Sequence, residues 1–233
     1  AFVAVFGTSP VAIRLSAFIP GLILIPAVYF FCRQFFKSQL VALLAAAFVT
    51  VSTESIEFAT NSRGYSSVML LSTLAAGLTA LKSYRERLWV WWALGVVHGL
   101  GFSFHPTYLF PFLCCQLWYV LSQNPKNLFN RTKMRRVVTS YILSGAILAL
   151  FYVPTWILSG PERMAGNGYV KRYTYFELWS DLKQFFPELL ATYHADYPLF
   201  LKGIMALGLL FYVFRKKDGW RVRVGLLAVP SFV

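Results

Sequence analysis

Apolar residues along this chain fall in long runs that are separated by short polar segments. Runs of about twenty residues with few charges predict membrane-spanning helices, because bilayer hydrocarbon offers no water to a backbone N–H or C=O group and a helix satisfies its own. We predict spans at residues 15–36, 40–60, 66–80 (extending to 84), 88–104, 106–121, 137–158, 199–214 and 222–233. The predicted fold class is therefore all-α, a polytopic transmembrane helix bundle of about eight spans.

Composition supports this class. Of the 233 residues 58% are hydrophobic and 13% are charged, which is too apolar for an ordinary soluble domain. We predict that residues 1–233 form a single transmembrane domain. The chain begins at Ala1 and stops inside an apolar run, with no signal peptide, so we interpret it as an internal fragment of a longer protein.

Basic residues alternate between the two sides of the predicted bundle. Fifteen of the 22 lie in the turns after the first, third, fifth and seventh spans: Arg33, Lys37, Lys82, Arg85, Arg87, Lys126, Arg131, Lys133, Arg135, Arg136, Arg215, Lys216, Lys217, Arg221 and Arg223. The positive-inside rule makes these turns cytoplasmic, and seven of the nine acids lie on the other side. We therefore attribute the net charge of +13 to the membrane topology of the chain and to contact with anionic lipid. Nucleic-acid binding is the alternative interpretation of this charge, and we do not expect it, because the charge is spread over four turns rather than one face.

Polar residues crowd the non-cytoplasmic ends of the second and third spans. Glu54, Glu57 and Asn61 have i, i+3, i+7 spacing, which predicts one stripe on a helix, and Arg63 and Tyr65 open the next span. Charges at headgroup depth are costly unless they pair, face a cavity or bind a ligand. Arg63 either bridges Glu57 as a structural clasp or binds an anionic group, and the guanidinium fork suits a phosphate.

Two histidines lie seven residues apart on the fourth span. His98 is placed in the middle of the membrane, where we expect it to hydrogen-bond to a neighbouring helix. His105 precedes Pro106 at the non-cytoplasmic end, close to the polar residues described above. It is a candidate to contact a phosphate or a sugar, and the alternative is a histidine that only shapes the turn.

One long loop, residues 159–198, lies on the non-cytoplasmic side. Its second half has an apolar helical stripe that predicts an amphipathic helix lying in the membrane interface. This helix either packs against the bundle as a lid or gates a site for a lipid-borne substrate. Candidates to line that site are the loop residues Lys171, Arg172, Tyr193, His194 and Asp196, together with Glu54, Glu57 and Asn61.

Several short sequence motifs, occurring in a fixed order within residues 6–120, are shared with a known family. They are an "FG-x-S-x-x-A-x-R-L" entry to a span, a basic turn, an Ala-rich span, and "R-x-Y" at the start of the next span. In this the chain resembles the dolichyl-phosphate-mannose protein mannosyltransferase-like glycosyltransferases, which include the bacterial lipid A aminoarabinose transferases. The resemblance implies a GT-C fold, an active site on the outer face, and a sugar donor carried on a polyprenyl phosphate.

The resemblance also implies roles for single residues. Arg63 matches the family arginine that contacts the donor phosphate, and Tyr65 matches its aromatic companion. From chemistry alone, His105, Lys171 and Arg172 are lesser candidates for the same task. The catalytic Asp or Asp-Glu pair belongs to a loop ahead of Ala1, so no catalytic residue is assigned here and we expect this segment to be inactive alone. Val68 stands where metal-using relatives carry an Asp, so we assign no metal or cofactor and leave a divalent cation open.

These observations predict a membrane glycosyltransferase that moves a sugar from a polyprenyl-phosphate donor to a lipid, glycan or protein acceptor. We expect a multi-pass protein of the bacterial inner membrane or an equivalent membrane, with its active site on the non-cytoplasmic side. The alternatives are a transporter or flippase of an amphipathic solute, and a non-catalytic scaffold subunit. A transporter would show charges near the bilayer midplane and an internal repeat, which we do not find in the sequence.

Overall fold

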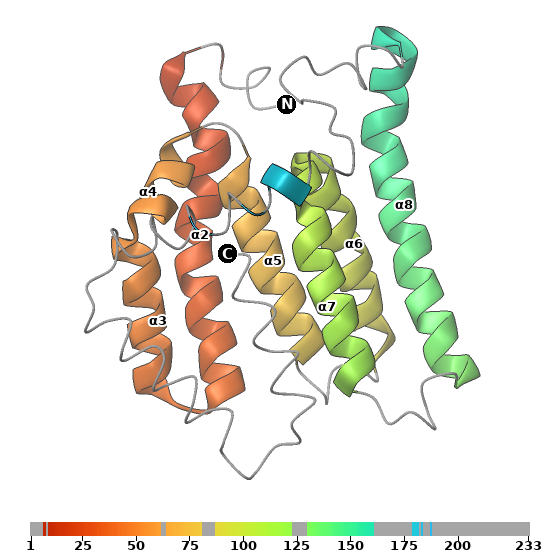
Figure 1. Cartoon of the computed structure of the whole chain (residues 1–233), viewed down its shortest axis with the longest axis horizontal. Coiled ribbons are helices and arrows are strands. Elements are labelled where there is room, and N and C mark those ends of the chain that lie inside the picture. The colour runs from red at the N-terminus through yellow and green to blue at the C-terminus, as the bar shows by residue number, and fades with distance from the viewer. Residues whose placement is uncertain are drawn as a thin grey trace. The chain divides into compact units, whose positions relative to one another are not determined.

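The computed structural model describes residues 7, 9–61, 64–80, 87–122, 130–160, 179–181, 183 and 187. The chain divides into two units, residues 1–154 with 224–233 and residues 155–223. The helices are α2 (Pro10–Phe36), α3 (Gln39–Val51), α4 (Thr53–Thr60), α5 (Tyr65–Ala80), α6 (Leu88–Phe104), the 3₁₀ helix η1 (Pro106–Tyr108), α7 (Leu109–Ser122) and α8 (Arg131–Ser159) (Figure 1). The described residues contain no strand, which confirms the all-α class for this part of the chain.

Helices occupy the places of the first six predicted spans. By length and composition α2 and α8 are long enough to cross a membrane, and the bent pair α3–α4 is a third candidate. Helices α5 and α6 are shorter apolar helices. The predicted spans 199–214 and 222–233 lie outside the described residues, so the count of eight stays a prediction.

The second predicted span, residues 40–60, is a bent pair of helices that together still pass as one candidate span, so only the expectation of one continuous helix was wrong. Helices α3 and α4 meet at an angle of 57° at Ser52. Ser52 is extended, and its Oγ accepts a hydrogen bond from the N–H of Ser55 at 3.3 Å, so it caps a new helix. The stripe therefore holds for Glu54 and Glu57 on α4, whereas Asn61 lies just beyond the last residue of that helix.

Helix α2 packs against α3, α4 and α5. It begins where Ser9 Oγ accepts from the N–H of Ala12 at 3.2 Å. A Cβ atom at Gly21 would lie 2.6 Å from the Cβ of Ala59 on α4, so the backbones of these two helices approach closely there. The hydroxyl of Ser66 on α5 donates to the Ala17 carbonyl at 2.7 Å and ties α5 to α2.

Helices α5, α6 and α7 share a small core. Its buried residues are Ala75, Val90, Trp91, Leu94, Cys115 and Tyr119. Many large apolar side chains point outward instead: on α8, Ile142 is 67% exposed and Leu150 is 70% exposed. Apolar surface of this extent suits hydrocarbon rather than water, which supports an integral membrane protein.

Helix α8 approaches α6 at two glycines. The Ser144 hydroxyl donates to the Gly95 carbonyl at 2.9 Å, and a Cβ at Gly99 would lie 2.7 Å from the Cβ of Ile147. Small residues at such a contact let two helix backbones come together, as is common in membranes. Next to Gly99 on α6, the buried His98 hydrogen-bonds through Nδ1 to the Tyr108 hydroxyl at 3.0 Å. This confirms the predicted hydrogen bond and identifies η1 as the partner element.

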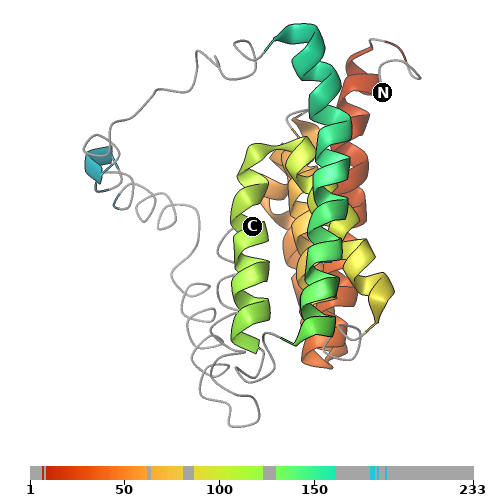
Figure 2. The same ribbon diagram turned by 90° about the vertical axis from the view of Figure 1, so that its right-hand side faces the viewer.

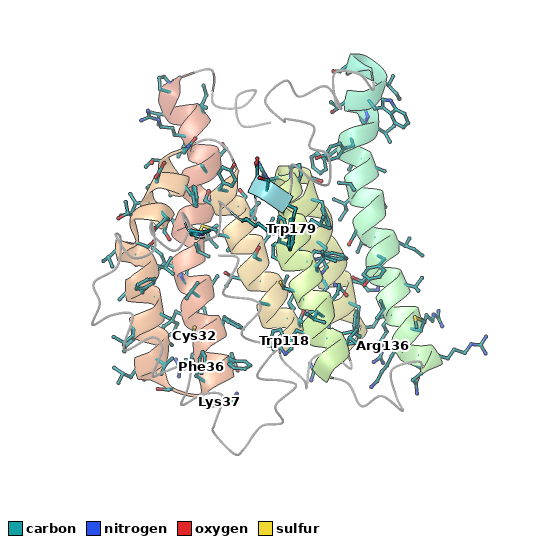
Figure 3. The ribbon with its side chains drawn as sticks, viewed as in Figure 1. Cys32, Phe36, Lys37, Trp118, Arg136 and Trp179 are labelled. Atoms are coloured by element: carbon teal, nitrogen blue, oxygen red, sulfur yellow. The ribbon has the colours of Figure 1, made fainter. Side chains whose placement is uncertain are left out.

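Basic residues gather at one end of the first unit. The C-terminal end of α2, the C-terminal end of α7 and the N-terminal end of α8 lie at the same end in both views (Figures 1 and 2). Lys37, which follows α2, and Arg136, on the first turns of α8, are labelled at this end (Figure 3). The described cations thus agree with the predicted alternation, and we call this the basic end.

Candidate functional site

Three aromatic side chains meet at the end of the bundle opposite the basic end. The Tyr65 ring at the start of α5 lies 5.0 Å from that of Phe58 on α4 and 4.7 Å from that of His105 after α6, measured between ring centroids. We call these three residues the aromatic cluster. The structure therefore brings together Tyr65 and His105, which the sequence assigned to the same site, and adds Phe58, which the sequence analysis missed.

Gly64 positions Tyr65 at the start of α5. Its φ of +80° is in the left-handed region that favours glycine, and its carbonyl accepts from the N–H of Val68 at 3.1 Å. A Cβ at this position would lie 3.4 Å from the carbonyl oxygen of Phe104. The glycine thus lets the start of α5 lie against the end of α6, where His105 follows.

Replacing Gly64 by valine should lower the free energy of unfolding by about 1–2 kcal/mol, because a β-branched residue is strained at this φ. Denaturant unfolding in detergent micelles measures the change. Gly64→Asn is the matched control, since asparagine tolerates the left-handed region, and it should lose distinctly less stability. Equal losses for the two variants would mean that the backbone conformation is not what matters here.

His105 has one ring nitrogen committed to the turn. Its Nδ1 accepts from the N–H of Thr107 at 3.2 Å and lies 2.9 Å from the Thr107 hydroxyl oxygen. Neutral His105 therefore carries its proton on Nε2, and burial lowers the pKa of His105 below its ordinary value of 6.5. The structural interpretation of His105 as a turn residue is supported, and Nε2–H is still able to donate to a ligand.

This pKa gives stability a defined pH dependence. The unfolded chain takes up the His105 proton first as the pH falls, so the stabilisation is complete above pH 6.5 and declines below it, toward the lowered folded pKa. We expect the melting temperature of the wild type to fall more between pH 7.5 and pH 5.5 than that of His105→Asn, whose side-chain oxygen can still accept from Thr107. Parallel pH profiles for the two proteins would contradict this assignment.

The acidic residues of α4 have different surroundings. The Ser52 hydroxyl donates to Oε2 of Glu54 at 2.7 Å, in the first turn of α4, where a carboxylate also complements the helix dipole. Glu57 is exposed, and its carbonyl accepts from the N–H of Asn61 at 2.8 Å. Glu54 thus fits a structural role at the helix start, whereas the exposed Glu57 side chain is available to a ligand.

An apolar cleft of about 200 Å³ lies between α2, α3 and α4. Its apolar walls include Phe18, Leu22, Ile25, Val49, Ile56 and Ala59. The hydroxyls of Thr50 and Thr60, which also line it, donate to carbonyls of their own helices at 2.8 and 3.0 Å. The cleft exists because α4 bends away from α3 at Ser52, and its lining suits a hydrocarbon chain.

Other predicted site residues lie outside the described residues: Arg63, Lys171, Arg172, Tyr193, His194 and Asp196. Whether Arg63 bridges Glu57 or binds an anion therefore stays open. In the second unit, Trp179 is 62% exposed and the Lys183 ammonium lies 5.7 Å from its ring centroid, as i, i+4 neighbours on a helix do. The full amphipathic helix of the loop 159–198 stays a prediction.

Within the described ranges, no three His, Cys, Asp or Glu residues lie close enough together to hold a metal ion. Val68 lies on α5, one turn after Gly64. The prediction of no assigned metal, with a divalent cation left open, stays a prediction.

Long helices with outward-facing apolar surfaces, and polar groups at their ends, define a helical integral membrane protein. The chain belongs to the dolichyl-phosphate-mannose-protein mannosyltransferase family, whose model matches residues 1–158. This confirms the resemblance found in the sequence and places the chain among membrane glycosyltransferases. No curated protein and no solved structure matches the chain.

Proposed function

We propose that this chain forms the donor-binding part of a glycosyltransferase that takes a sugar from a polyprenyl phosphate and passes it to an acceptor on the non-cytoplasmic face. The observation that carries the proposal is the position of the aromatic cluster. It lies at the end of the bundle opposite the basic end, and Tyr65 follows Arg63 by two residues. Family membership supports the reaction type.

The chemistry needs positive charge at the leaving group. The acceptor oxygen attacks the anomeric carbon, the bond from that carbon to the phosphate oxygen breaks, and the polyprenyl phosphate leaves with the bonding electrons. Arg63 is proposed to bind the phosphate oxygens and stabilise the charge that develops on them. His105, neutral and with its proton on Nε2, would add a hydrogen bond without adding charge.

The remaining candidates are proposed to surround the sugar and the acceptor. They are Glu57 and Asn61 at the end of α4, Glu54 one turn earlier, and Lys171, Arg172, His194 and Asp196 of the loop. No residue of this chain is proposed as the general base that deprotonates the acceptor. A divalent cation remains open as a cofactor.

The isoprenoid tail needs an apolar path at the same depth in the membrane. We propose that it lies in the cleft between α2, α3 and α4, whose wall includes Ile56 and Ala59 of the helix that carries Phe58. The hydroxyls of Thr50 and Thr60 bond to their own helices, so these two groups are already satisfied beside a hydrocarbon chain.

The test uses the full-length protein in proteoliposomes with a polyprenyl-phosphate sugar labelled in the sugar. We expect the label to move to an acceptor while free polyprenyl phosphate is formed. A donor that crosses the bilayer intact, with its sugar still attached, would instead support the transporter or flippase. The proposal would be contradicted if the folded protein bound no donor and neither transferred the sugar nor moved the donor across the bilayer.

A further inference from the structure

A polar pocket lies at the basic end, away from the proposed donor site. It is lined by Arg33 and Gln34 on the last turn of α2, by Lys37 after it, and by Gln39 at the start of α3. Its volume is about 310 Å³. All four lining residues are exposed, and two of them are cations, so the pocket offers donors to an anion of modest size.

The two cations are held in place by the local structure. The Arg33 Nη1 donates to the Tyr29 hydroxyl at 3.2 Å, which orients the guanidinium along α2. Lys37 has a φ of +56°, and among the described residues no other residue except glycine has a positive φ. Its N–H donates to the Arg33 carbonyl at 3.1 Å, so the strained turn keeps both cationic residues in the lining of one pocket.

The surface beside the pocket is apolar. Phe36, the last residue of α2, is 42% exposed, and Leu40, on the first turn of α3, is 67% exposed. A ligand that fills this place therefore meets cations and amide groups at one end and hydrocarbon-like surface at the other. This arrangement fits the phosphate of a membrane lipid better than a free ion, because only a lipid uses both surfaces.

We propose that this pocket binds the phosphate headgroup of an anionic phospholipid from the leaflet at the basic end. Arg33 and Lys37 pair with the phosphate, and Gln34 and Gln39 donate hydrogen bonds to the headgroup. The acyl chains lie along Phe36 and Leu40. The site is separate from the donor phosphate proposed for Arg63, and it would bind lipid whether or not that proposal is correct.

The experiment titrates the full-length protein in detergent with phosphatidylglycerol and counts bound lipid by native mass spectrometry. The double variant Arg33→Gln/Lys37→Gln should bind about 30-fold more weakly than the wild type, the effect of two juxtamembrane cations. Arg131→Gln/Arg135→Gln is the matched control, because it removes two exposed cations from the same end, and it should bind as the wild type does. Equal losses in both double variants would mean a diffuse charge effect and would overturn the proposal.

Two further arms keep the result interpretable. Lys37→Gly removes the charge and also removes the strain of a side chain at positive φ. The variant should therefore fold at least as well as the wild type and still bind lipid more weakly. Inorganic phosphate at the same concentration should not displace the lipid. If inorganic phosphate displaces phosphatidylglycerol, or if phosphatidylcholine binds equally well, the pocket is not an anionic phospholipid site.

Discussion

Arg63→Ala should lower the rate of sugar transfer from a polyprenyl-phosphate donor by about 10²–10³-fold, the usual effect of removing one group that stabilises charge in a transition state. The reason is that the departing phosphate keeps its negative charge at the border of the lipid, where a guanidinium fork can hold two of its oxygens. The measurement is kcat and kcat/KM for the full-length protein in proteoliposomes. Arg63→Lys should retain part of the activity, because it keeps the charge but not the fork.

Arg14→Ala is the matched control for this change. Arg14 is exposed on α2, one turn before Ala17, whose carbonyl bonds to Ser66 near the start of α5. It therefore lies at the same end of the bundle as the aromatic cluster and carries the same charge. Its loss should leave transfer within about twofold of the wild type. Loss of activity in both variants would indicate a general charge effect.

Gly99→Ala should lower the free energy of unfolding by about 1–3 kcal/mol, as overpacking of a close contact does. The added Cβ would lie 2.7 Å from the Ile147 Cβ and 3.1 Å from the Ser144 carbonyl oxygen, so α8 would have to move away from α6. Such a shift would also strain the hydrogen bond from Ser144 to Gly95. Unfolding by SDS in mixed micelles measures the effect.

Gly145→Ala on α8 serves as the matched control. A Cβ there would meet nothing within 4 Å, and alanine is the better helix former, so the variant should be as stable as the wild type or gain up to about 1 kcal/mol. An equal loss from the two glycine-to-alanine changes would show that the contact between α6 and α8 is not the reason.

Much of the helix arrangement could be predicted, because a bilayer requires apolar runs of a fixed length. The first residue of a helix could not be predicted in this way. Helix α2 begins at Pro10, ahead of the predicted residue 15, because Ser9 caps it and a proline fits the first turn. Helix α8 begins at Arg131 rather than at residue 137, because the Asn130 side chain caps it by accepting from the N–H of Thr132 at 3.0 Å, and its basic first turns lie outside the apolar run. Hydropathy locates where the lipid ends, whereas capping and side-chain chemistry locate where the helix ends.

The break at Ser52 shows the same limit. A window of about twenty residues averages over a bend, since the residues on both sides of Ser52 are mostly apolar or small. The signal was present in the serine that caps α4, followed by Glu54 in its first turn. A capping pattern inside an apolar run should therefore be weighed as a possible helix start.

For the candidate site, alternation of spans was sufficient to put Tyr65 and His105 at the same end. Their contact depends on more than alternation, because Gly64 must adopt a positive φ and His105 must bond to Thr107. The cleft could not be predicted, because it arises from the bend at Ser52 and from the close approach of Gly21 to Ala59. Such features depend on the relative placement of helices, which periodicity does not determine.

Photocrosslinking tests the central claim, that the end carrying the aromatic cluster holds a polyprenyl phosphate, most directly. A polyprenyl phosphate with a photoreactive group in its first isoprene units is irradiated with the full-length protein, and the labelled peptides are identified by mass spectrometry. We predict labels on the cleft residues of α2 and α4, Leu22 and Ile56 among them, and competition by unlabelled polyprenyl phosphate. Labels confined to the basic end around Lys37, or labels that unlabelled polyprenyl phosphate does not reduce, would contradict the account.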